Sequence, residues 1–157
     1  MGTIEHIVYQ PIDQEYEEGQ LDYIRIPVTS ARLLANHGLE NDRKAGHHPK
    51  RQLNILSREW LDKIAPLGYQ TKPGEFGEQV TVANMDFDEL VPGTRIQLGE
   101  TAVVEITKGR TGCSRLEAAQ GQSIAGIGPI GLLARVVVGG EIRVGDAVGV
   151  LDAQTTG

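Results

Sequence analysis

The sequence contains a single cysteine, Cys113, in a setting that favours thiolate chemistry. Three cationic side chains lie within five residues of it: Lys108, Arg110 and Arg115. Ser114 and Glu117 form an S-x-x-E capping box, which predicts that a helix begins just after the sulfur. Cationic neighbours and the free N–H groups of a helix N-terminus both favour the anionic form of a thiol, which attacks electrophiles or binds a soft metal. Cys113 is therefore the first candidate for chemistry.

The alternative for Cys113 is a structural role, because a free cysteine usually packs as a small buried hydrophobe. Gly112 favours the functional interpretation, since a glycine lets a ligand approach the backbone closely. Catalysis by a Cys–His pair of the protease kind is not indicated, because no protease nucleophile signature surrounds the cysteine.

Two further segments have compositions suited to a binding site. Residues 73–79 read Pro-Gly-Glu-Phe-Gly-Glu-Gln, a tight loop that enters a strand. Its N–H groups and polar side chains would line a pocket, or it is an ordinary turn with Phe76 in the core. Residues 42–58 carry five bases against one acid, which suits a phosphate group, although a solvated loop remains the alternative. No G-x-x-x-x-G-K-[ST] sequence occurs, so this segment is not a Walker loop.

The charge of −6 comes from one end of the chain. Residues 1–22 contain six acids and no lysine or arginine, and the remainder carries 15 acids and 15 bases. We expect these first 22 residues to form an acidic, solubilising flank. A local basic patch on a neutral body favours a small anionic ligand over a nucleic acid, and no aromatic residue lies among the bases.

Composition and length predict one soluble domain of 157 residues. No apolar run approaches the roughly 20 residues that span a bilayer, so we expect no membrane association. A single cysteine and the lack of a signal-peptide pattern favour a cytoplasmic location.

The elements expected to position these residues are mostly short strands. Strands are predicted over 21–28, 52–56, 79–83, 94–98, 101–107, 132–138 and 147–151. Gly139-Gly140 predicts a hairpin between 132–138 and 141–144, because both glycines tolerate positive φ. Helices are predicted over 57–65, capped by Ser57, over 114–120, and as a short turn over 31–36. Twenty glycines among short strands favour a curled sheet or barrel.

The order of several sequence blocks resembles the MOSC domain, the module also found at the C-terminus of molybdenum cofactor sulfurases. The blocks stand at 38–43, 51–54, 73–79, 98–99, 104–107, 110–113, 131–136 and 140–146. The widespread pattern has Asn where Gln79 stands and Pro where Gly112 stands, so the chain resembles a short stand-alone bacterial type. The resemblance covers about residues 30–150 and implies a mainly β, MOSC-type barrel with a few short helices, whose core lies over that range.

The resemblance also implies a cofactor and a set of binding residues. Cys113 matches the cysteine that ligates molybdenum of the pterin cofactor (molybdopterin) in some relatives and is proposed to carry a persulfide in others. We expect molybdenum cofactor, and not pyridoxal phosphate, with Cys113 as the catalytic residue and metal ligand. The expected contacts are Arg43, Lys44, Lys50 and Arg51 for phosphate, Gly77, Glu78 and Gln79 as a pocket wall, and Arg110, Thr111, Ser114 and Arg115 around the thiolate.

Three functions follow from this resemblance. The first is a molybdenum-dependent reductase of N-hydroxylated or related small substrates, which needs a separate electron donor because the chain has no flavin, haem or iron–sulfur signature. The second is a sulfur carrier that holds a persulfide on Cys113 and requires a sulfur donor protein. The third is a module that binds the cofactor without turnover.

Overall fold

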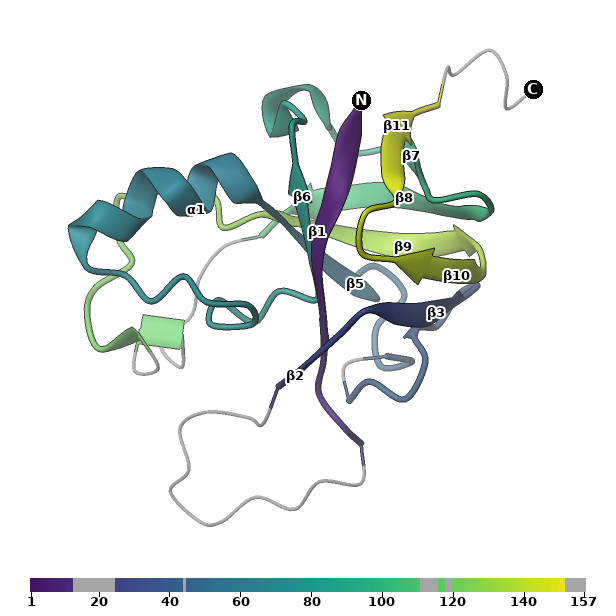
Figure 1. Cartoon of the computed structure of the whole chain (residues 1–157), viewed down its shortest axis with the longest axis horizontal. Coiled ribbons are helices and arrows are strands. Elements are labelled where there is room, and N and C mark those ends of the chain that lie inside the picture. Colours follow the sequence, from purple (N-terminus) through teal and green to yellow (C-terminus); the bar gives the residue numbers. More distant parts are fainter. Residues whose placement is uncertain (13–24, 44, 111–115, 118–119, 152–157) are drawn as a thin grey trace.

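Seven strands of the computed structural model, which describes residues 1–12, 25–43, 45–110, 116–117 and 120–151, close into a barrel (Figure 1). Around the ring they are β1 (Gly2–Tyr9), β11 (Ala147–Val150), β7 (Arg95–Leu98), β8 (Ala102–Gly109), β9 (Leu132–Val138), β5 (Leu53–Ser57) and β6 (Val80–Ala83). The ring closes because β1 pairs with both β6 and β11. A short strand, β2 (Ile26–Val28), extends the sheet on the other half of β1.

One face of each strand lies inside the barrel, and burial alternates along those strands whose other face is open to solvent. Along β8, Ala102, Val104 and Ile106 are buried, whereas the residues between them are partly exposed. We call the resulting interior the barrel core; its buried members are Ile4, Ile7, Leu33, Leu39, Leu53, Ile55, Val80, Val82, Leu90, Ile96, Leu98, Ala102, Val104, Ile106, Ala134, Val136, Ile142 and Val148. Burying this apolar face is the main force that stabilises the barrel.

A second, three-stranded sheet packs against the barrel. It consists of β10 (Gly140–Arg143), β3 (Ser30–Leu34) and β4 (Gly38–Leu39), in the order β10-β3-β4. Leu33, Leu39 and Ile142 of this sheet are buried in the barrel core. The small sheet therefore covers barrel residues that would otherwise contact water.

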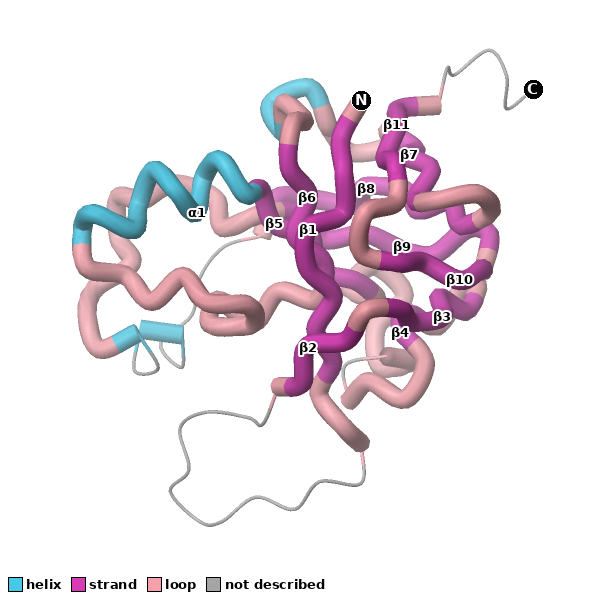
Figure 2. The backbone as a smooth tube through the Cα atoms, viewed as in Figure 1, coloured by secondary structure: helices cyan, strands magenta, loops and turns pink. Residues whose placement is uncertain are grey.

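On another side of the barrel, α1 (Arg58–Ile64) and the 3-10 turn η1 (Ala65–Leu67) connect β5 to β6, which are parallel. A parallel pair requires such a crossover connection. Beneath it lies what we call the helix-side cluster, whose buried members are Leu56, Leu61, Ile64, Phe76, Leu116, Ile124 and Ile130. Figure 2 shows that this side of the molecule is built mainly from loops, in contrast to the strands of the barrel.

The helix and most strands lie close to their predicted positions. Strand 132–138 is confirmed without change, and 101–107 becomes β8, which continues to Gly109. Ser57 caps α1 by accepting a hydrogen bond from the Trp60 N–H (3.2 Å). Gly68, with φ of 95°, ends the turn that follows. The mainly β, barrel-type fold with short helices is thus confirmed.

The predicted hairpin at Gly139-Gly140 is wrong. Strand β10 pairs with β3 instead of β9, and neither glycine has a positive φ. A Cβ on Gly139 would lie 2.7 Å from the Leu33 carbonyl oxygen, and one on Gly140 would lie 3.0 Å from the Thr101 Cβ. The two glycines therefore permit a close approach between chains where the backbone passes from the barrel to the small sheet.

Two other expectations are corrected. The short helix over 31–36 is instead β3, because pairing with β10 and β4 overrides the helical preference of Ala-Arg-Leu-Leu-Ala. The core does not begin near residue 30, because Gly2–Tyr9 forms β1 at the junction of three strands. Of the expected acidic flank 1–22, residues 13–22 lie outside the described residues.

No helix within the described ranges is long and apolar enough to cross a membrane.

Candidate functional site

A buried glutamine joins three segments of the chain at one end of the barrel. The Gln79 side chain accepts a hydrogen bond from the Asn54 N–H (2.7 Å) and donates one to the Asp42 carboxylate (2.7 Å). Asn54 in turn donates from its side-chain nitrogen to the Gly77 carbonyl (3.1 Å). All three side chains are buried, with 2–7% of their surface exposed. This network fixes the segment after β4, the start of β5 and the loop before β6 relative to one another.

The loop before β6 is also held by Glu78. Its two carboxylate oxygens accept hydrogen bonds from the N–H groups of Gly74 and Phe76 (3.1 Å each). Positive φ at Gly74 (86°) and Gly77 (76°) lets the loop turn back on this carboxylate. Burial raises the pKa of the Glu78 carboxyl, although the backbone N–H groups and the positive charge of Arg110 oppose that rise.

Arg110 connects this loop to the segment that contains Cys113. Its Nη1 donates to the Phe76 carbonyl (2.6 Å), and its backbone pairs with Gly131 (3.0 Å) and Ile130 (2.7 Å). The guanidinium therefore lies against the 74–79 loop. We call the assembled group, Asp42, Asn54, Gly77, Glu78, Gln79 and Arg110, the polar cluster.

Arg43, one of the predicted phosphate contacts, lies next to the polar cluster. Its N–H donates to the Gln10 carbonyl (2.8 Å), and the Gln10 N–H donates to the other oxygen of Asp42 (2.7 Å). Gln10 itself is only 4% exposed. In the part of the chain that the structure describes, neither polar atom of its side chain has a hydrogen-bond partner.

Two more of the predicted bases lie near the end of β8. Lys50 and Arg51 are exposed, and the Lys50 carbonyl accepts a hydrogen bond from the Thr107 hydroxyl (2.5 Å). Thr107 precedes Arg110 by three residues, so this stretch of the 42–52 loop runs beside the strand that leads to the cysteine. Arg58, counted with the same basic run, lies instead on α1, where it pairs with Asp62 (3.1 Å).

The structure thus brings together Arg43, Gly77, Glu78, Gln79 and Arg110, and places the backbone of Lys50 beside β8. Five predicted site residues lie outside the described residues: Lys44, Thr111, Cys113, Ser114 and Arg115. Contact of any predicted site residue with a cofactor, whether described or not, stays a prediction.

Sequence reasoning missed Asp42, Asn54 and Gln10 as members of the site. Asn54 did carry a signal, because it is polar in an otherwise apolar strand, Leu53-Asn54-Ile55-Leu56. A polar side chain that is buried in such a strand needs a hydrogen-bond partner from elsewhere in the fold. The partners of Asn54 lie 23 and 25 residues away in the sequence, so local patterns could not identify them.

The family of this chain follows from its match to known proteins. The profile of the MOSC domain matches residues 42–149, more than half of the chain and a range that includes the whole polar cluster. The chain belongs to the MOSC domain family. The resemblance inferred from the sequence blocks is thereby confirmed.

Several solved structures share the fold. YiiM from Geobacillus stearothermophilus aligns with a TM-score of 0.72 and 20% identity, over 97% of this chain and 76% of that chain. YuaD from Bacillus subtilis gives 0.69 and 20%, over 96% of both chains. YiiM from Escherichia coli gives 0.67 and 22%, over 96% of this chain and 70% of that chain. A sequence comparison with curated proteins finds no significant match.

Proposed function

We propose that this MOSC-domain protein binds molybdenum cofactor, with Cys113 as the protein ligand of the metal, and reduces N-hydroxylated or related small substrates. The observation that carries the proposal is the polar cluster. It joins the loop 74–79 and the Asp42 segment to Arg110, three residues before Cys113 in sequence. Family membership supports an association with molybdenum cofactor.

The residues present fit such a group. A phosphate-bearing pterin offers an anion at one end and hydrogen-bonding ring atoms at the other. Arg43, Lys50 and Arg51 supply cations around the cluster, and Gln10 has a buried amide whose polar atoms no described residue satisfies. A buried amide without partners is costly, and a polar ligand would remove that cost.

The protein's own residues would bind, orient and hold protons. Arg43, Lys50 and Arg51 would bind the phosphate, and Arg110 would keep the 74–79 loop against the segment that bears the cysteine. Glu78, with its raised pKa, can hold a proton next to a cation. The cofactor, when bound, supplies the two-electron chemistry, and a separate protein must supply the electrons.

Metal content tests the proposal. Protein expressed in cells that make the cofactor should contain molybdenum in about a one-to-one ratio by elemental analysis, and Cys113→Ala should lose most of it because a thiolate ligand is removed. Ser30→Ala, a small exposed residue on β3, is the control and should retain the metal. Absence of molybdenum from both isolated and reconstituted protein would contradict the proposal.

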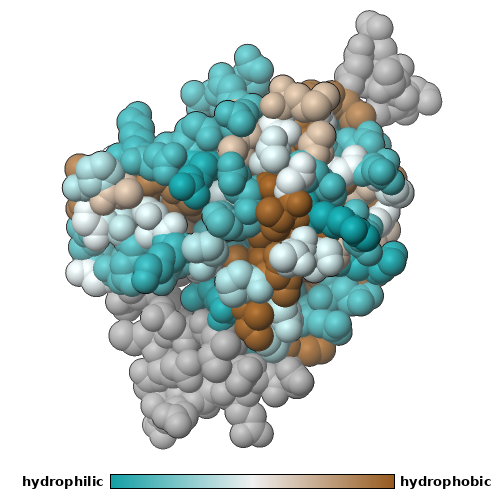
Figure 3. Space-filling view, viewed as in Figure 1, coloured by the Kyte–Doolittle hydropathy of each residue, from teal (hydrophilic) through white to brown (hydrophobic). Residues whose placement is uncertain are grey.

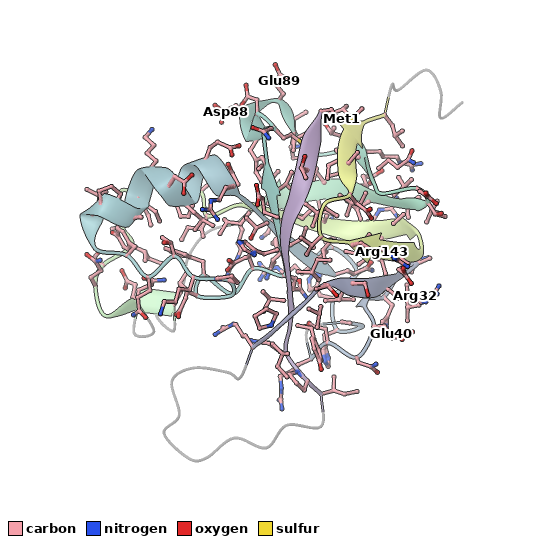
Figure 4. The ribbon with its side chains drawn as sticks, in the orientation of Figure 1. Met1, Arg32, Glu40, Asp88, Glu89 and Arg143 are labelled. Carbon is pink, nitrogen blue, oxygen red and sulfur yellow. The ribbon has the colours of Figure 1, made fainter. Side chains whose placement is uncertain are left out.

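The basic residues provide a second arm of the test. Arg51→Gln should lower cofactor retention by about tenfold, since a charge-assisted contact to phosphate is lost. Arg32→Gln, another exposed arginine that Figure 4 places on the small sheet, is the matched control. Equal retention by the two variants would remove the 42–52 segment from the site.

The same samples separate the two alternative functions. A sulfur carrier would show an adduct of about +32 Da on Cys113 by mass spectrometry and no stoichiometric metal. A non-catalytic module would retain molybdenum but reduce no N-hydroxylated compound with any chemical or protein electron donor.

A further inference from the structure

A large cavity lies between the barrel and α1 and extends to Gly109 and Gly131, which adjoin Arg110 of the polar cluster. Its volume is about 1050 Å³. The described residues that line it come from the end of β5, from α1 and η1, from residues 84–88 after β6, and from the end of β8 and the segment that leads into β9. None of these is a member of the polar cluster. A cavity of this size is at the upper end of the range in which proteins bind small molecules.

The floor of the cavity is apolar because it lies where the two hydrophobic cores meet. Met85, Phe87 and Leu132 pack against the barrel core, whereas Trp60 and Ile127 pack against the helix-side cluster. One face of the helical segment supplies residues 59, 60, 63, 64 and 67, which are about one turn apart. Leu67 remains 63% exposed, so apolar surface is left open to solvent.

The aromatic ring of Trp60 is held in place at this floor. Its indole nitrogen donates to the Ile127 carbonyl (3.3 Å), and its ring meets Phe76 edge-on, with centroids 5.3 Å apart. Trp60 is partly exposed. A fixed aromatic ring at the wall of an open cavity is suited to contact with an apolar or cationic ligand.

The rim of the cavity is acidic. Glu59, Asp86 and Asp88 line it against a single described base, Lys63. Glu59 accepts a hydrogen bond from the Asn84 N–H (2.8 Å) and Asp86 accepts one from the Asp88 N–H (2.9 Å), so both carboxylates are held in position. In the view of Figure 3, the α1 side of the surface is largely hydrophilic, and an apolar stripe runs over the central strands.

We propose that this cavity binds a small organic cation with an apolar body, such as an alkyl or aryl amine. The apolar part would lie on Trp60, Met85 and Leu67, and the ammonium group would lie among the rim carboxylates. Anionic ligands are disfavoured by the same rim, which distinguishes this site from the basic surroundings of the polar cluster. The inference does not depend on the proposed function, because it needs neither metal nor Cys113.

Trp60 is the only tryptophan of the chain, so its fluorescence reports directly on the cavity. Metal-free protein would be titrated with 4-phenylbutylammonium, 4-phenylbutanol and 4-phenylbutyrate, with calorimetry as a second readout. The cation should give a saturable change and bind most tightly, the alcohol more weakly, and the anion least. Absence of saturable binding by any probe would overturn the site, and equal binding of all three would overturn its charge preference.

Two pairs of variants locate the binding. Asp88→Asn should weaken binding of the cation by roughly two- to fivefold, as expected for loss of one solvent-exposed charge, whereas Glu89→Gln should not. Figure 4 shows Asp88 and Glu89 close together on the 3-10 turn η2 (Phe87–Glu89), and of the two only Asp88 lines the cavity.

The second pair changes exposed apolar residues, so that folding is not at risk. Leu67→Lys adds a charge at the cavity and should abolish binding of the cation, whereas Val91→Lys changes a residue of similar exposure outside it. If the two variants of either pair changed binding of the cation equally, the cation would not be bound in this cavity as proposed.

Discussion

The barrel and the region around the helix-side cluster differ in the hydrogen bonds that hold each of them together. In the barrel, each strand of the ring pairs through backbone hydrogen bonds with a neighbour on each side. Around the helix-side cluster, individual side chains join the loops: Tyr69 donates to the Ser123 carbonyl (2.6 Å), and Trp60 donates to the Ile127 carbonyl (3.3 Å). The cluster is therefore expected to open locally at a lower free energy than the barrel.

Strand β5 belongs to both regions. Every residue of β5 is buried, because Ile55 faces the barrel core while Leu56 faces the helix-side cluster. The residues of β6 are also all buried. The comparison shows how a small barrel can carry a binding region. It shares one fully buried strand, β5, with a region that is built from loops, and both candidate sites include residues of that strand.

The largest expected effect is that of Phe76→Ala. Phe76 is fully buried and contacts both Trp60 and Tyr69 through its ring. The variant should lower the free energy of unfolding by about 3–5 kcal/mol, measured by urea denaturation. Hydrogen exchange should accelerate most in α1 and around residues 69–77, before the barrel strands are affected.

Ile106→Ala is the matched variant in the barrel core, where Ile106 is 1% exposed. It should cost about 2–5 kcal/mol and accelerate exchange in all strands of the ring together. If both variants accelerate exchange uniformly, the two regions unfold as one unit and the distinction between them is lost.

The next largest loss of stability is expected from replacing either of two buried glutamines. Gln79 joins segments at the barrel end, whereas Gln120 joins loops by donating to the carbonyls of Gln70 (3.0 Å) and Glu75 (3.2 Å). Replacing either by alanine should cost about 1–3 kcal/mol, because buried backbone groups lose their partners. Exchange should accelerate in β5 and β6 for Gln79→Ala, but only around residues 70–75 for Gln120→Ala.

A matched control for both is Gln97→Ala, since Gln97 is only partly buried and bonds to the carbonyls of a turn. Its effect on stability should stay within about 0.5 kcal/mol. A similar loss of stability in all three variants would show that burial of the amide is not what matters.

The sequence predicted the barrel strands better than the loops for a physical reason. Strands such as β8 are rich in β-branched residues and are bounded by glycines, so they can be recognised from local sequence. Strand β1 was missed because a register irregularity between Ile4 and His6 interrupts its alternation. The acids at 13–22 also made its surroundings resemble a solvated flank.

The candidate site was predictable only in part. The family pattern identified Gly77, Glu78, Gln79 and Arg110, which the structure brings together. It could not identify Asp42 as the partner of Gln79, since that bond spans 37 residues and depends on how the loops meet. The cavity beside α1 was not predicted either, because it is formed by the packing of two regions and has no motif of its own.

The smallest expected effect concerns two glutamates whose environments shift the carboxyl pKa in opposite directions. A side-chain hydrogen bond from Arg135, with another from Arg95, lowers the pKa of Glu105 on the barrel wall, whereas burial raises the pKa of Glu78. Ionised Glu105 therefore stabilises the fold above its unfolded pKa, and this contribution is lost as the pH falls through its folded pKa. Protonated Glu78 gives a contribution that is complete below its unfolded pKa and is lost as the pH rises through its folded pKa.

Urea midpoints measured between about pH 3 and about pH 8 can separate the two contributions through the variants Glu105→Gln and Glu78→Gln. The stability lost in Glu105→Gln should be about 0.2–1 kcal/mol for each ion pair at neutral pH and should shrink as the pH falls. The stability of Glu78→Gln relative to the wild type should instead improve as the pH rises. The double variant should lose both of these contributions to the pH dependence of stability. Differences that do not vary with pH would mean that neither carboxyl is perturbed by folding, and the contrast between the barrel wall and the 74–79 loop would then rest on packing alone.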